Sequence, residues 1–132
     1  MELGEPFSIF DVAEGDATTV LNVTGEIDMQ TGPAFQRGLL RAIGASRGGL
    51  IVDLSRASFL DSSALTNLVN AFDHLRMKGG GTLAIVASDS RMRALFEVAR
   101  LERDFLIFST REQALAAMTP GDPSAAGSQA LH

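Results

Sequence analysis

The sequence contains no cysteine. Without thiols the chain cannot form a disulfide framework, a thiolate metal cluster or a cysteine nucleophile. It also has no apolar run long enough to cross a bilayer, and its first residues, MELGEPF, lack the basic and apolar blocks of a secretory signal. These absences favour a protein of the reducing cytoplasm that no membrane segment anchors.

An excess of positive charge is missing as well. Sixteen acidic residues against eleven basic ones give a formal net charge of −5. A protein that binds DNA or RNA through the phosphate backbone normally has a basic face. Here the arginines are scattered, and Arg91 and Arg93 form the closest pair. We therefore expect no nucleic acid among the partners of this protein.

The motifs of common enzymes are also lacking. The chain has no G-x-S-x-G elbow, no G-x-x-x-x-G-K-[ST] phosphate loop, no strand-linked G-x-G-x-x-G and no D-x-D-x-D-G run. The glycines of KGGGT, residues 78–82, follow a helical pattern and lead into a strand, which is the wrong order for holding a phosphate at a helix N-terminus. His132 is the last residue, and His74 has no positioned partner, so we interpret it as a surface residue. The sequence predicts no catalytic residue, no metal site and no cofactor.

The chain does have the apolar content of a folded domain. It has 132 residues, of which 45% are hydrophobic, and this predicts one domain with a real core. Alternating apolar residues indicate strands at 7–13 and 17–28, and the intervening turn favours an antiparallel hairpin. Residues 50–54 and 82–87 are nearly all apolar, which is typical of strands that are covered on both faces. A last strand is expected at 104–109.

Helical patterns separate the later strands. The first begins at Thr31-Gly32-Pro33, where the threonine can cap it, and is ended by Gly44, Gly48 and Gly49. The second ends at the glycines of KGGG. The third is capped within Ser88-Asp89-Ser90, and the fourth starts with a capping box that pairs Ser109 with Glu112 and runs to residue 118. The expected inward faces are Phe35, Leu39 and Ile43 in the first helix, Leu65, Leu68, Val69, Phe72 and Leu75 in the second, and Met92, Leu95, Phe96 and Ala99 in the third.

The order of these elements is β-β-α-β-α-β-α-β-α. Strand–helix–strand units demand parallel neighbours joined by right-handed crossovers, and the opening hairpin adds an antiparallel strand. The fold class is therefore α/β, with a mixed sheet of four to five strands and about four helices. We expect a single domain over residues 1–119. Residues 120–132 are rich in turn formers and small side chains, and we interpret them as a mobile tail.

A polar triplet interrupts this pattern in FLDSSALTNLVNAF, residues 59–72. Asp61, Ser62 and Ser63 begin the second helix, and aspartate and serine are the preferred helix caps because their oxygens accept unpaired backbone N–H groups. Three capping side chains stand where one suffices. They follow the buried strand LIVDL by a short loop, at the strand end where open α/β sheets place their sites. A functional serine is therefore a second interpretation beside that of a plain cap.

The outward side of this helix carries small neutral side chains. Thr66, Asn67 and Asn70 line up with the two serines at the three- and four-residue spacing of neighbours on a helix. Such side chains lose little entropy when they are immobilised, which suits a docking surface. An ordinary polar face is an equally good interpretation of the same pattern.

The stretch VDLSRASFLDSSALTNLVNAF resembles the signature of the STAS domain family, and specifically its anti-sigma factor antagonists. The resemblance covers about residues 7–118 and includes LNVTGEIDMQTGPAFQRGLLRAI and FLIFSTREQAL. The family continues Asp-Ser-Ser with Gly-Leu-Gly, whereas this chain has Ala64-Leu65-Thr66. Alanine is the better helix former, so we expect the helix to persist, but its methyl group changes how closely a partner can approach.

The resemblance implies a partner switch. In the family, the unmodified antagonist binds an anti-sigma factor, which is a serine kinase with an ATP-binding fold, and this frees the sigma factor. The kinase then phosphorylates the serine directly after the aspartate, and a serine phosphatase removes the phosphate. By motif position that serine is Ser62, with Ser63 as second choice. The expected partner-binding residues are Asp28, Asp61, Ser62, Ser63, Thr66, Asn67 and Asn70.

The same resemblance leaves two other roles open. STAS domains also serve as scaffolds of sensory assemblies and as accessory subunits of lipid-transport complexes. A scaffold should self-associate into large particles, whereas an antagonist is expected to be a monomer or weak dimer. A nucleotide-binding domain is disfavoured because no phosphate loop is present.

Overall fold

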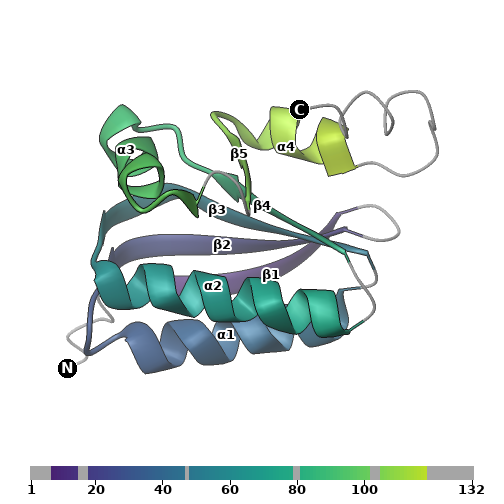
Figure 1. The fold of residues 1–132 in the computed structure, drawn as a ribbon. Helices are drawn as coiled ribbons and strands as arrows, with labels where there is room; N and C mark the ends of the chain where they lie inside the picture. The colour runs from purple at the N-terminus through teal and green to yellow at the C-terminus, as the bar shows by residue number, and fades with distance from the viewer. Residues whose placement is uncertain (1–6, 15–17, 47, 79–80, 102–104, 119–132) are drawn as a thin grey trace.

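The computed structural model describes residues 7–14, 18–46, 48–78, 81–101 and 105–118. The elements follow one another as β1 (Phe7–Glu14), β2 (Thr18–Ile27), α1 (Gly32–Ala45), β3 (Gly49–Leu60), α2 (Ser62–Met77), β4 (Thr82–Val86), α3 (Ser90–Val98), β5 (Leu106–Phe108) and α4 (Arg111–Met118) (Figure 1). The predicted α/β order is confirmed. The predicted tail at 120–132 lies outside the described residues. No helix of the described segments is both long enough and apolar enough to cross a membrane.

The strands form one mixed sheet in the order β1-β2-β3-β4-β5. β1 pairs antiparallel with β2, from Phe7 opposite Gly25 to Glu14 opposite Thr18. β2, β3, β4 and β5 are all parallel to one another, because a helix connects each pair. The hairpin and the mixed sheet that the sequence predicts are therefore both present, with five strands.

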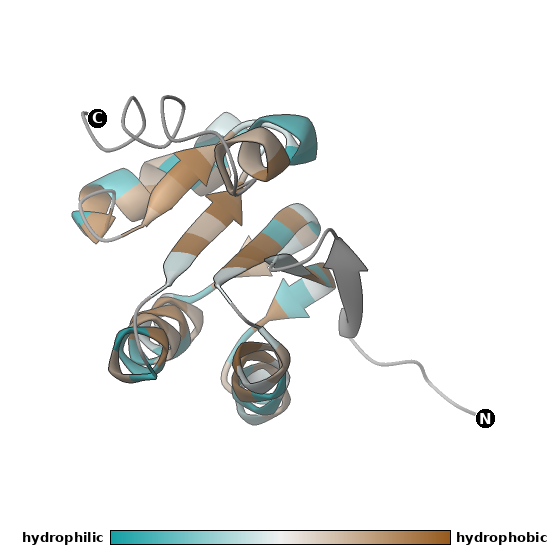
Figure 2. Cartoon of the chain, turned by 90° about the vertical axis from the view of Figure 1, so that its right-hand side faces the viewer, coloured by the Kyte–Doolittle hydropathy of each residue, from teal (hydrophilic) through white to brown (hydrophobic). Residues whose placement is uncertain are grey.

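Helices cover both faces of the sheet. α1 and α2 lie side by side below it in Figure 1 and α4 lies above it, an arrangement that Figure 2 shows end-on. Neighbouring strand residues point to opposite faces, so Leu21 and Val52 join the larger core with α1, α2 and α3, whereas Val20 and Ile51 pack against α4. Burial on both faces confirms the interpretation of the apolar strands at 50–54 and 82–87.

The helix faces agree with most of the predicted pattern. Phe35, Leu39 and Ile43 of α1 are buried as expected. α1 ends at Ala45, between Gly44 and the later glycines that were expected to end it. The Lys78 ammonium at the end of α2 donates to the carbonyl groups of Ile43 and Ser46 at the end of α1. In α2 the most buried positions are Ala64, Leu68, Ala71 and Leu75, while Leu65, Val69 and Phe72 are partly buried at the edge of the core.

Local predictions are wrong at α3, at the start of α4 and at the end of β3. Leu95 and Ala99 of α3 are exposed, because α3 lies at the end of the sheet and buries only Met92 and Phe96. The capping box of α4 lies one residue later than expected. The Thr110 hydroxyl accepts from the Gln113 N–H at 3.1 Å, and the Gln113 side chain accepts from the Ser109 N–H. Thr110-x-x-Gln113 fits the same box pattern, and the observed helix start selects it.

The third wrong prediction is the end of β3. The strand does not stop at Leu54 but runs to Leu60, because β2 continues to pair with it as far as Ile27 opposite Leu60. Two shifts of register, between Asn22 and Thr24 and between Gly25 and Glu26, interrupt this pairing. No loop therefore separates β3 from Asp61, and the polar triplet stands directly at the end of a strand.

Candidate functional site

The site is the N-terminus of α2. Asp61 adopts an extended backbone (φ −100°, ψ −176°) and is the N-cap residue of the helix. Its Oδ1 atom accepts a hydrogen bond from the Ala64 N–H at 3.1 Å, so the predicted capping role is confirmed for this aspartate.

The two serines that follow differ in their surroundings. The Ser63 hydroxyl is partly buried and donates to Oδ1 of Asp61 at 2.6 Å. Ser62 is exposed, and its hydroxyl has no hydrogen-bond partner within the described part of the chain. Only its backbone carbonyl is engaged, by the Thr66 hydroxyl at 3.1 Å. The structure thus separates an anchored serine from an available one.

Hydrogen bonds hold Asp61 in its ionised form. The bond from the Ser63 hydroxyl is the largest cause that lowers the pKa of Asp61 below its usual value, and the Ala64 N–H also lowers it, against an opposing effect of burial. A fixed negative charge therefore lies beside the two serines at neutral pH.

Asp28 organises the loop between β2 and α1. Its Oδ1 atom accepts from the N–H groups of Gln30 and Thr31, at 3.0 and 3.1 Å. The Thr31 hydroxyl accepts from the Asp28 N–H at 2.9 Å and donates to the Glu26 carbonyl at 3.1 Å. That hydroxyl does not cap α1, contrary to the prediction, because these loop contacts occupy it.

The loop and the start of α2 are joined directly. The Asp61 N–H donates to the carbonyl of Ile27 at 3.1 Å, and the Asn67 side chain donates to the carbonyl of Gly32 at 3.2 Å. Gly32 lies so near that a β-carbon there would be 3.4 Å from Asn67 Nδ2 and 3.7 Å from the Ser63 hydroxyl oxygen. Asp28, Asp61, Ser63 and Asn67 therefore belong to one internal cluster.

The remaining predicted residues form an exposed line. Ser62, Thr66 and Asn70 follow one another at intervals of four along α2, and all three are exposed. We call them the polar stripe. His74 continues this line, and its Nδ1 atom lies 3.0 Å from the Asn70 carbonyl, so the prediction of a surface histidine is confirmed. The seven predicted residues therefore form two sets, four in the cluster and three in the stripe, which runs along α2 from Ser62 to Asn70.

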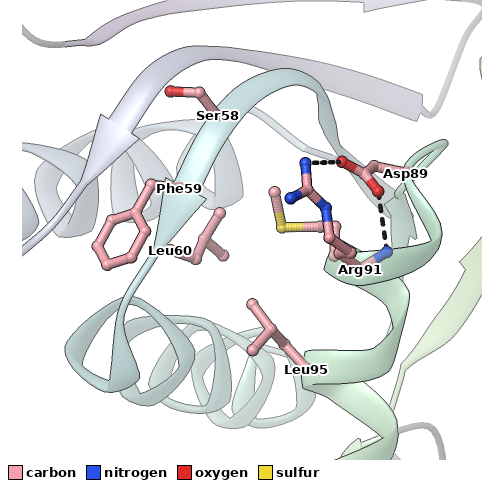
Figure 3. Close-up of a pocket in the computed structure, with 7 residues that line it drawn as sticks. Ser58, Phe59, Leu60, Asp89, Arg91 and Leu95 are labelled. Carbon is pink, nitrogen blue, oxygen red and sulfur yellow. Dashed lines mark hydrogen bonds and ion pairs between the residues drawn. The ribbon is translucent and has the colours of Figure 1, made fainter.

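Sequence reasoning missed the apolar residues around this end. Met29, in the loop that Asp28 organises, is 79% exposed, and Phe59, at the end of β3, is 49% exposed. Between β3 and α3 lies a pocket of about 250 Å³, shown in Figure 3. The sequence offered one hint of this apolar surface, Met29 in a polar stretch, but single exposed apolar residues are common on protein surfaces.

Metal ligands are not gathered here. Among the described residues, no three histidine or acidic side chains lie close enough together to hold a metal ion. The chemistry that the site offers is that of a hydroxyl, a carboxylate and surface amides.

Comparisons with known proteins show which family the chain resembles. The model of the STAS domain family matches residues 10–114. The chain is 28% identical over 110 residues to the anti-sigma-F factor antagonist RsfB of Mycobacterium tuberculosis, covering 83% of this chain and 88% of that protein. It is 26% identical over 103 residues to the anti-sigma-B factor antagonist of Bacillus subtilis, covering 78% and 92%.

A solved structure has the same fold. The crystal structure of an anti-sigma factor antagonist from Mycobacterium paratuberculosis superposes with a TM-score of 0.71 and 27% identity, over 85% of this chain and 93% of that one. Because the family model spans most of the sequence, this chain belongs to the STAS domain family.

Proposed function

We propose that this protein is an anti-sigma factor antagonist of the bacterial cytoplasm, and that it acts by binding without being an enzyme. Its unmodified form binds an anti-sigma factor that is also a serine kinase, and this binding releases the sigma factor. Phosphorylation of Ser62 abolishes the binding, and a serine phosphatase restores it. Support comes from the similarity to proteins named as such antagonists and from the availability of the Ser62 hydroxyl.

The contrast between Ser62 and Ser63 carries the site assignment. A kinase joins the serine oxygen to the terminal phosphorus of ATP and releases ADP and a proton, so the hydroxyl must be free to react. The Ser63 hydroxyl would first have to leave its 2.6 Å bond to Asp61, and its phosphate would then lie against that carboxylate and Gly32. Ser62 is exposed and carries neither obstacle.

The fold tolerates a phosphate at Ser62. Ser62 is the first residue of a 16-residue helix, where the helix dipole and the first N–H groups favour negative charge. Because the side chain is exposed, the added phosphate displaces no core residue. The modification therefore acts on the surface and leaves the folded domain in place.

A bound partner does not tolerate the same phosphate. If the partner covers the polar stripe, it must bury or displace nearly two negative charges. An uncompensated buried charge typically costs about 3–5 kcal/mol. A loss of about 4 kcal/mol weakens binding roughly a thousandfold. A local change can thus dissociate the complex without a rearrangement of the domain.

The test is a phosphorylation assay. Each ATP-binding anti-sigma factor of the source organism is incubated with this protein and ATP, and the phosphate is located by mass spectrometry. We expect one phosphate on Ser62, its loss in Ser62→Ala and its retention in Ser63→Ala. Stoichiometric phosphate on another residue would overturn the site assignment.

A further inference from the structure

The pocket beside the site is lined from two elements. Ser58, Phe59 and Leu60 come from the end of β3, whereas Asp89, Arg91, Met92 and Leu95 come from the start of α3. In Figure 3, the side chains of Leu60 and Leu95 extend into the space between the two elements. Both elements meet at the carboxyl end of the parallel strands, which is where open α/β sheets bind their ligands.

The pocket is lined by apolar side chains and by two charged ones, Asp89 and Arg91. Leu60 and Met92 are buried, at 4% and 6% exposure, and Leu95 is 38% exposed. The Asp89 carboxylate is engaged on its own helix, since it accepts from the Arg91 N–H at 2.8 Å and lies 3.6 Å from the Arg91 guanidinium. The Arg91 side chain is 92% exposed, so its positive charge is open to an incoming acidic group.

The size of the pocket limits the occupant. Sites for drug-sized ligands and cofactors enclose about 300–1,000 Å³. A pocket of about 250 Å³ lies below that range and suits one large apolar side chain. Interfaces gain most of their energy from such anchors, which are buried in well-packed pockets near the middle of the contact.

The pocket is continuous with the phosphorylation site. Leu60 ends β3 and Ser62 begins α2, so their Cα atoms are at most about 7.6 Å apart, two peptide units of 3.8 Å. A standard interface covers about 800 Å² on each partner, which corresponds to a disc of about 16 Å radius. A partner that covers Ser62 from this end of the molecule also covers the pocket.

We propose that the pocket receives one leucine, methionine or phenylalanine side chain of the anti-sigma factor that covers Ser62, with an acidic residue of that partner next to Arg91. This inference rests on the proposed function and adds the chemistry that the partner must present. Phe59 also lines the pocket and is 49% exposed, so it adds apolar surface beside the anchor. Ser62 controls whether the partner can approach, and the pocket provides the anchor.

A pair of matched variants tests the anchor. Leu95→Trp fills the pocket, whereas Leu40→Trp makes the same change at a leucine of similar exposure on α1, 36% against 38%, outside the pocket. Binding to the anti-sigma factor that phosphorylates Ser62 is measured by isothermal titration calorimetry. We expect at least tenfold weaker binding for Leu95→Trp and a change within twofold for Leu40→Trp. Equal affinity of Leu95→Trp and wild type would overturn the inference.

A second measurement uses the unaltered chain, so it does not depend on the folding of a variant. Methyl NMR of ¹³C-labelled methionine separates Met92, in the pocket wall, from Met77, at the far end of α2. Saturation with the anti-sigma factor should shift the Met92 signal and leave that of Met77 unchanged. A Met92 signal that does not move would overturn the inference. The same shift in a concentrated solution of this protein without the partner would also overturn it, because the pocket would then bind a second copy of the chain. If no anti-sigma factor binds the wild-type protein, the proposed function is wrong. If one binds but the Met92 signal does not move, only the inference about the pocket is wrong.

Discussion

Two helices of this protein start in the same way and differ in what surrounds them. α2 begins with Asp61-Ser62 and α3 with Asp89-Ser90, and in both the aspartate is the N-cap and the serine the exposed first residue. At α3 the Asp89 carboxylate accepts from the Arg91 N–H and lies 3.6 Å from the guanidinium of the same arginine. At α2 a second serine, Ser63, binds the cap.

The difference extends to the neighbouring loop. The start of α2 is joined to the loop after β2 through the Asp61 N–H and the Asn67 side chain. The start of α3 is instead beside Arg93, which donates to the carbonyl of Ala87 at 2.9 Å. An Asp-Ser pair is therefore sufficient for a cap, and the internal cluster and the polar stripe are what distinguish the candidate site. α3 therefore serves as a comparison for the helix cap of α2, while its own start lines the proposed anchor pocket.

The largest expected effect separates the two serines. Ser62→Asp places a negative charge on the proposed docking surface, and we expect it to weaken binding of the anti-sigma factor by at least tenfold, less than phosphate because aspartate is smaller and carries less charge. Ser90→Asp makes the same change at the start of α3. It is expected to weaken binding less than Ser62→Asp by a clear margin in the same calorimetric titration. Equal losses for the two variants would remove the special status of α2.

Removal of the cap should cost more at α2 than at α3. Asp61→Ala loses the bond to the Ala64 N–H and leaves the Ser63 hydroxyl without its acceptor, so we expect the free energy of unfolding to fall by about 2 kcal/mol. Asp89→Ala loses one cap and is expected to cost about 1 kcal/mol. Urea denaturation measures both, and the reverse order would contradict the role of Ser63.

The charge of Asp61 predicts a dependence on pH. Its pKa is lower in the folded protein than in the unfolded chain, so its ionised form stabilises the fold above its unfolded pKa, and this contribution is lost as pH falls through the lower folded value. Asp61→Asn keeps a good cap without the charge. The stability difference between wild type and Asp61→Asn should be constant near pH 7 and shrink toward acid pH. A difference that grows on acidification would contradict the assigned sign.

The smallest expected effect concerns the other end of α3. Arg100 follows the C-cap and has a positive φ of 61°, which is unfavourable for a residue with a β-carbon, whereas the C-cap of α2, Lys78, has an ordinary helical backbone. Arg100→Gly should stabilise the protein by about 0.5 kcal/mol, because relief of the strain exceeds the greater entropy of glycine in the unfolded chain. The same change at the preceding C-cap, Ala99→Gly, should destabilise the protein, because Ala99 has an ordinary helical backbone (φ −80°, ψ −3°), and the midpoints of thermal unfolding would show both effects.

Local rules predict much of this fold because they act within a few residues. The apolar spacing of Phe35, Leu39 and Ile43 finds the buried side of α1, and the side chain of Asp61 finds the start of α2. The length of β3 could not be predicted by such rules. Four of its last six residues are exposed, and only the pairing with β2 keeps them extended. No apolar pattern in the sequence reports such pairing.

The site shows the same contrast between local rules and long-range packing. Position in the motif points to Ser62 and Ser63 alike, and the hydroxyl of either could act as acceptor. Their difference arises because Gly32, which is distant in the sequence, lies close to Ser63 and to Asn67 one turn further along α2, whereas Ser62 is exposed. The pocket between β3 and α3 depends on the same long-range packing, and the wrong prediction that Leu95 is buried hid it.

The most direct test of control by Ser62 compares the affinity of the anti-sigma factor for the unmodified protein and for the protein that carries phosphate on Ser62, under identical salt and pH. We expect phosphorylation to weaken binding about a thousandfold and to leave the circular dichroism spectrum of this protein unchanged. Equal affinities for the two forms would contradict it.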